Sequence, residues 1–136
     1  MITESEMKII TLDNIHKVPI LVSPNVVNNN YTLKEDLYFN FGDLHFYVMY
    51  GFIWDGASIP KIAWMTTGTP FEPDHLIASL VHDFLYTYGH AMGFTRKQAD
   101  KLYKDILSKC GKSTYVCWKE YRVLRLFGKK NYKKGR

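Results

Sequence analysis

The sequence predicts an α+β fold, in which N-terminal antiparallel strands with a hairpin pack against three to four C-terminal helices. Short β-branched and aromatic runs fill the first half of the chain, whereas the second half carries apolar residues at helical spacing between start and stop signals. Because the strands come first and the helices follow, a wound parallel sheet is not expected. The 136 residues fit one domain, which we expect over residues 1–128, followed by a basic tail at 129–136.

The first half of the chain contains several strand signals. Gly42 and Asp43 lie between two aromatic-rich arms, and glycine can open a two-residue turn because it accepts a positive φ. This pattern predicts a hairpin. The polar cluster at residues 25–30 is typical of a loop. The predicted strands are residues 8–12, 16–22, 37–41 and 44–52.

Four helices are predicted in the second half. Pro60 is well placed to start a short one, with Ser58 or Ile59 at its entry. Thr95, followed three residues later by Gln98, is a capping box that starts the third. Glycines follow the other apolar-periodic segments and end them. The predicted helices are residues 61–67, 73–88, 95–110 and 113–127.

The predicted helix at residues 73–88 carries an unusual polar face. At about 100° per residue, five side chains fall within an arc of roughly 100° opposite a broad apolar face. They include no Lys, Arg or Glu, the residues that usually coat an exposed helix. We therefore predict a functional cleft there, and an ordinary surface or a buried polar network is the alternative. The five residues are His75, Ser79, His82, Asp83 and Tyr86.

Two kinds of chemistry suit these side chains. His82, Asp83 and Asp100 are candidate ligands of a divalent metal ion that activates water, and Asp55 is a candidate further ligand. Alternatively, His82 is a general base oriented by a carboxylate, with Ser58 as the nucleophile. Asp55 and Ser58 equally fit simple capping roles before a helix. The candidate catalytic residues are His82, Asp83, Asp55, Ser58 and Tyr86, and the candidate binding residues are His75, Ser79 and Arg96.

Arg96 and Asp100 are four residues apart on the predicted third helix, so we expect an ion pair between them. Two cysteines, Cys110 and Cys117, have neither a redox-motif nor a zinc-site spacing and are expected to be reduced thiols that pack.

Charge is distributed unevenly along the chain. The net charge is +5, and the segment 129–136 carries five of the 18 basic residues and no acidic residue, so the rest of the chain is balanced. Such a tail can contact phosphate, which makes nucleic acid a weak candidate partner, although no base-reading module is visible. No apolar run reaches the roughly 20 residues of a membrane span, and we expect no membrane insertion. The acidic N-terminus lacks the features of a secretory signal, which favours a cytoplasmic protein.

Several ordered motifs together resemble a family of small proteins found mainly in bacteriophages and prophages and catalogued only as a domain of unknown function. The resemblance covers residues 46–128. It implies a phage or prophage source and a shared site made from Asp55, Ser58, His82, Asp83, Tyr86, Arg96 and Asp100, but it implies no reaction. The motifs are Gly51-Phe52, Asp55-Gly56-Ala57-Ser58-Ile59-Pro60, Trp64, Gly68 with Pro70, His82-Asp83 with Leu85-Tyr86, Arg96 with Ala99-Asp100, and Tyr121 with Arg125 and Gly128.

These observations favour a non-catalytic protein, either a virion or tail component or a protein that binds a phage or host factor. The alternative is a small, metal-dependent hydrolase that uses His82 and Asp83 with Asp55 and Asp100. We expect the protein in the host cytoplasm or within a phage particle, and the oligomeric state is left open. We also expect Asp55 to lie near His82, and deletion of residues 129–136 to leave the fold intact because Gly128 already ends the last helix.

Overall fold

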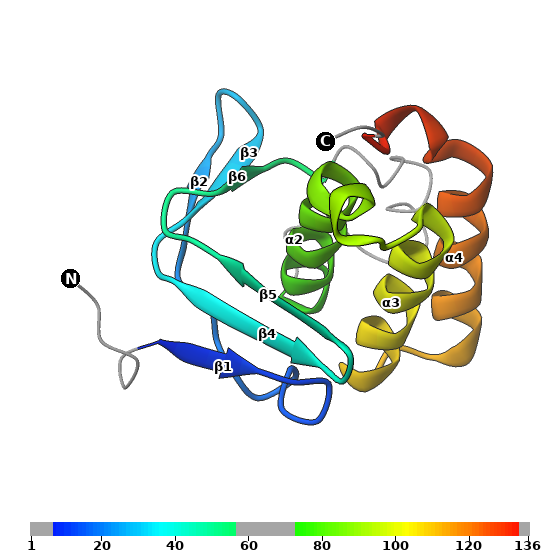
Figure 1. Ribbon diagram of the computed structural model, residues 1–136, viewed down its shortest axis with the longest axis horizontal. Coiled ribbons are helices and arrows are strands. Elements are labelled where there is room, and N and C mark those ends of the chain that lie inside the picture. The colour runs from blue at the N-terminus through cyan, green and yellow to red at the C-terminus, as the bar shows by residue number, and fades with distance from the viewer. Residues whose placement is uncertain (1–6, 57–72, 134–136) are drawn as a thin grey trace. The chain divides into compact units, whose positions relative to one another are not determined.

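The computed structural model describes residues 7–56 and 73–133 of the chain. The chain divides into two compact units, residues 1–55 and 56–136, and each is described by itself. The first contains strands in two small sheets and the second contains the helices, so the predicted α+β class is confirmed (Figure 1). A single domain over residues 1–128 stays a prediction.

The first sheet contains the predicted hairpin. Its strands are β1 (Lys8–Ile10), β4 (Leu37–Phe41) and β5 (Leu44–Val48), in the order β1-β4-β5. β4 and β5 pair antiparallel across the Gly42-Asp43 turn, where Gly42 has a φ of 75° as predicted. β1, however, pairs parallel to β4, which departs from the expectation of antiparallel strands alone. β1 and β4 are far apart in the sequence, so no turn motif between them could indicate this pairing.

The two faces of the β4–β5 hairpin differ in burial, as the strand period of two requires. Phe39 pairs with Phe46 on the buried face, and their rings stack with centroids 5.0 Å apart. Tyr38 pairs with Tyr47 on the opposite face, where the rings stack at 4.8 Å and Tyr47 is exposed. Alternation of large side chains therefore fixes the register, because a slip by one residue would expose the phenylalanines.

The second sheet differs most from the sequence-based expectation. Its strands are β2 (Val22–Asn25), β3 (Asn30–Leu33) and β6 (Ile53–Trp54), in the order β2-β3-β6. The strand predicted at residues 16–22 was wrong except for Val22, since the preceding residues form turns and irregular backbone. The polar cluster at residues 25–30 does contain the predicted turn, in which Asn29 has a φ of 55°, but asparagines at both its ends belong to strands.

The second unit contains three α-helices close to their predicted bounds: α2 (Pro73–Tyr88), α3 (Arg96–Lys109) and α4 (Thr114–Phe127). The capping box at Thr95 is confirmed, because its hydroxyl accepts from Gln98 N and the Gln98 side chain accepts from Thr95 N. Ser113 caps α4 with one hydrogen bond, which its hydroxyl accepts from Val116 N. α3 packs against both α2 and α4 (Figure 1). The helix predicted at residues 61–67 lies outside the described residues.

The segment after α4 packs onto the helical unit. A short 3-10 helix, η3 (Lys129–Asn131), brings in Tyr132, which is buried and donates its hydroxyl hydrogen to Phe94 O at 2.5 Å. Lys133 N also donates to Tyr86 O at 2.8 Å. This packing argues against the expectation that residues 129–136 can be deleted without effect, which stays a prediction, because the buried Tyr132 ring belongs to the core.

Both cysteines are free thiols, and Cys117 is buried. None of the helices within residues 7–56 and 73–133 combines the length and the hydropathy that a transmembrane span requires.

Candidate functional site

Asp100 on α3 is the centre of a buried polar network. Its Oδ1 lies 2.8 Å from His82 Nε2 and 2.5 Å from the Tyr86 hydroxyl, and both groups come from α2. Its Oδ2 accepts from Arg125 Nη1 of α4 at 2.7 Å. His82 and Asp100 are both 0% exposed, and Tyr86 is 1% exposed. Both carboxylate oxygens are thus engaged, and the network ties the three helices together.

The network keeps Asp100 ionised despite its burial. Burial by itself would raise the pKa of this carboxyl, but the hydrogen bond and charge of His82, with the hydrogen bonds from Tyr86 and Arg125, outweigh it and lower the pKa below its usual value. Burial, reinforced by Asp100, raises the pKa of Tyr86 far above its usual value, so its phenol stays protonated and donates. An ionised carboxylate only accepts, and His82 Nε2 is therefore the donor.

Arg96 connects this network to the end of α4. Its guanidinium donates to Leu124 O at 3.0 Å and to Arg125 O at 3.1 Å, two carbonyls in the last turn of the helix. The predicted ion pair with Asp100 is confirmed at 3.8 Å, although Arg125 approaches the carboxylate more closely. Gly128 is required here, because a Cβ would lie 2.7 Å from the Tyr86 hydroxyl.

A second buried network joins the same helices around Glu120 of α4. His75 Nε2 of α2 lies 2.9 Å from Glu120 Oε2, and the Tyr103 hydroxyl of α3 donates to Glu120 Oε1 at 2.6 Å. All three residues are buried. The edge of the Tyr103 ring meets the His82 ring at 5.4 Å between centroids, so the two networks share a contact. Polar groups therefore fill the interior between the helices in two connected clusters.

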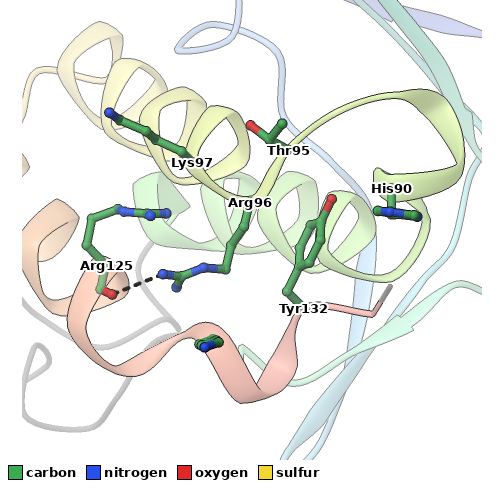
Figure 2. A pocket seen from close by; sticks show the side chains of 7 residues that line it. His90, Thr95, Arg96, Lys97, Arg125 and Tyr132 are labelled. Atoms are coloured by element: carbon green, nitrogen blue, oxygen red, sulfur yellow. Dashed lines mark hydrogen bonds between the residues drawn. The ribbon is translucent and has the colours of Figure 1, made fainter. Parts of the chain in front are cut away.

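A basic pocket of about 490 Å³ opens beside the first network, where α3 begins and α4 ends. Figure 2 shows the Arg96 and Arg125 side chains directed toward each other on one side, with Tyr132 and His90 on the other. No aspartate or glutamate is among the described residues that line it. The lining residues are His90, Thr95, Arg96, Lys97, Arg125, Lys129 and Tyr132.

Comparison with known proteins identifies the family. The model of a family described as "Protein of unknown function (DUF1353)" matches residues 31–123. The chain belongs to this family. No curated protein and no solved structure matches the chain. The family match starts and ends earlier than the motifs that carry the resemblance, so it includes β3 but not Arg125 or the pocket residues after it.

The structure of this DUF1353 member brings together four of the residues singled out in the sequence. His82, Tyr86, Arg96 and Asp100 share the first network. They form a buried cluster, as the alternative of a buried polar network expects, and the functional role of these residues stays a prediction. His75 and the Ser79 side chain, which donates to Leu76 O at 2.9 Å, are also buried.

Three candidates remain, of which Asp83 forms its hydrogen bond outside this cluster. Asp83 is half-buried, and its Oδ2 accepts from Gly56 N at 3.0 Å instead of facing Asp100. Asp55 is exposed at the end of the first unit, and its proximity to His82 stays a prediction. Ser58 lies outside the described residues.

The proposed metal ligands are not assembled within the described ranges. No group of three or more His, Cys, Asp and Glu side chains there has an arrangement that could hold a metal ion. Of the predicted set, His82 and Asp100 are in direct contact, whereas Asp83 is directed to a backbone amide. The hydrogen bond between His82 Nε2 and Asp100 Oδ1 engages one potential metal-binding atom of each residue.

Sequence reasoning missed the residues that complete both networks and the pocket. Glu120 carried a signal, because it lies three residues from Cys117 and four from Leu124 on the buried stripe of α4. A carboxylate at a core position requires a buried partner. Arg125 was noted only as part of a motif, and Lys129 and Tyr132 were assigned to a tail.

Proposed function

We propose that this protein is a non-catalytic binding protein, acting on a phage or host factor in the cytoplasm of an infected cell or as part of a phage particle. His82, Tyr86 and Asp100, which suggested catalysis, serve instead to hold three helices together. The surface that meets a ligand is the basic pocket beside them.

One observation carries the proposal: the His82–Asp100–Tyr86 network is closed. His82 and Asp100 are 0% exposed, and each oxygen of Asp100 already accepts at least one short hydrogen bond. A general base must come within hydrogen-bond distance of the substrate proton. No such approach to His82 is open, so the network fits a structural role, in which polar groups specify one packing of the helices.

The basic pocket supports a binding role, because it is open to solvent, whereas His82, Tyr86 and Asp100 are buried. It lies at the surface ends of α3 and α4, and its cationic side chains are carried on elements that the network fixes. Ligand sites are concave, largely preformed and provided with a few well-placed polar groups. The phage setting rests on the motif resemblance.

The experiment tests the alternative that the protein is a metal-dependent hydrolase. Protein purified without chelator is analysed for zinc, manganese and iron, melted with and without EDTA, and assayed with bis(4-nitrophenyl) phosphate and 4-nitrophenyl phosphate. We expect well below one metal ion per chain, the same melting temperature in EDTA, and no turnover above that of Asp100→Asn. Metal near one per chain, together with hydrolysis that Asp100→Asn abolishes, would overturn the proposal.

A further inference from the structure

We infer that the basic pocket binds the phosphate group of a small organic phosphate, with its organic part extending toward Tyr132 and His90. This inference rests on the proposed function, since it names the ligand class of the same pocket.

The pocket carries more positive charge than Asp100, the buried acid that pairs with Arg96 and Arg125, can balance. Four of its seven lining residues are Arg or Lys, and none is Asp or Glu. The nearest carboxylate that contacts them is Asp100, which is fully buried and already bound to His82 and Tyr86. Lys129 is exposed and makes no ion pair with the described residues. Such a cluster repels itself when empty, and a bound dianion would relieve the repulsion.

Two arginines are held in fixed positions facing the pocket. Arg125 is anchored by one hydrogen bond to Asp100 at 2.7 Å, and Arg96 by two bonds to the carbonyls of Leu124 and Arg125 (Figure 2). A guanidinium has about five N–H donors, so each keeps donors beyond those used by its anchors. Planar, preoriented guanidinium groups match the oxygens of a phosphate better than a mobile lysine does.

The size of the pocket points to more than a bare phosphate ion. Its volume of about 490 Å³ falls within the roughly 300–1,000 Å³ typical of small-molecule sites. Figure 2 places Tyr132 and His90 at the side away from Arg125, where ring surfaces rather than guanidinium groups line the space. A phosphate bound at the arginines therefore leaves room for a sugar or a ring at the tyrosine.

A nucleic-acid strand fits the charge distribution less well. Backbone recognition needs a stripe of available cations along a face. The basic side chains farther along α3 are engaged elsewhere: Lys101 pairs with Asp105 at 3.3 Å, and Lys104 lies over the Tyr121 ring at 4.8 Å. The pocket instead brings four cationic side chains together where α3 begins and α4 ends, which favours a small ligand.

Calorimetric titration of the full chain at constant chloride tests this inference. The probes are AMP, ribose 5-phosphate, inorganic phosphate and a short single-stranded oligonucleotide, with adenosine and ribose as phosphate-free controls. We expect saturable binding of AMP or ribose 5-phosphate, weaker binding of inorganic phosphate, and no binding of the phosphate-free compounds.

Lys129→Ala should weaken binding of the phosphate ester about tenfold, as loss of one charge-assisted hydrogen bond predicts. Its matched control Lys130→Ala, an exposed neighbour on η3 that does not line the pocket, should change affinity less than about twofold.

Arg125→Lys gives a second test, because it keeps the charge but loses the planar fork, and it should also weaken binding about tenfold. Lys129 is exposed, so its variant keeps the test valid if the arginine variant fails to fold. Absence of saturable binding by every phosphate, or equal losses in Lys129→Ala and Lys130→Ala, overturns the inference. If inorganic phosphate binds as tightly as the esters, the claim that the pocket also holds the organic part of the ligand is overturned. If the oligonucleotide binds and Lys130→Ala weakens its binding as much as Lys129→Ala does, the pocket is part of a nucleic-acid surface instead.

Phosphorus NMR of the bound ester separates this inference from the proposed function. An ester recovered intact after prolonged incubation supports both. Release of inorganic phosphate leaves the pocket as a phosphate site but overturns a non-catalytic role. Failure to bind any phosphate overturns only the inference, since the metal and turnover assays decide the proposed function independently.

Discussion

Replacing His82 by alanine removes a fully buried ring from the centre of the first network. The imidazole donates to Asp100 Oδ1 and packs on the Tyr86 ring at 4.0 Å between centroids. Losing the donor costs about 1.5 kcal/mol, at the low end for a charged acceptor because Tyr86 still donates to the same oxygen. The space left by the ring costs about 2 kcal/mol more, within the range for large-to-small core substitutions. We expect a total destabilisation of roughly 3–4 kcal/mol.

Urea denaturation of wild type and variant measures this loss, and thermal melting should fall by about 12–16 °C, since roughly 4 °C accompanies each kcal/mol for a chain of this size. His16→Ala is the matched control, because His16 is exposed, and it should cost less than about 0.5 kcal/mol. His82→Gln restores a donor near the Nε2 position and should recover about 1 kcal/mol. A His82→Ala protein as stable as the wild type would refute the structural role, since residues held for catalysis can often be removed without loss of stability.

Three further outcomes follow from the same geometry. The pKa of Asp100 in the folded protein is lowered from 3.8, so its carboxylate stabilises the fold above pH 3.8 and this stabilisation is lost as the pH falls below that value. Acid unfolding followed by circular dichroism should therefore be steeper in wild type than in Asp100→Asn. Gly128→Ala forces a Cβ to within 2.7 Å of the Tyr86 hydroxyl and of Leu124 O, and urea melts should show a loss of about 1–3 kcal/mol; an unchanged midpoint would mean that the turn relaxes freely. Tyr132→Ala removes a buried ring and its bond to Phe94 O, and should lower the melting temperature by several degrees, whereas a melt that matches wild type would restore the view of this segment as a dispensable tail.

The helices were predictable because their signals are local. Thr95 with Gln98, and the glycines at positions 89, 111 and 128, mark the ends of α2, α3 and α4 within a few residues. The β4–β5 hairpin was predictable for the same reason, since Gly42 marks its turn. The parallel pairing of β1 with β4 was not, because it depends on residues almost thirty positions apart along the chain. β2 and β3 were misplaced because asparagine and proline, poor strand formers by composition, occupy paired positions.

Four residues of the predicted polar site lie in one buried network, and their functional role stays a prediction. The polar face of α2 was recognised from His75, Ser79, His82 and Tyr86, and the absence of lysine, arginine and glutamate was taken to indicate a cleft. The same absence is expected of a buried face, because unpaired charges are excluded from a protein interior. Only the partners distinguish the two cases, and they come from other helices. Glu120 and Arg125 of α4 meet α2 and α3 through tertiary packing that no local spacing encodes.

The position of Asp100 explains why this chain keeps a charged group where an apolar one would pack more simply. Replacing a buried ion pair by apolar side chains is often neutral or stabilising, so stability alone does not account for the carboxylate. Its two oxygens have different partners: Oδ1 accepts from His82 and Tyr86, whereas Oδ2 accepts from Arg125, which lines the pocket. An apolar side chain in place of Asp100 could fill the space between the helices, but Arg125 would then lose its hydrogen-bond acceptor. The buried network therefore fixes the position of Arg125, a cation that lines the basic pocket.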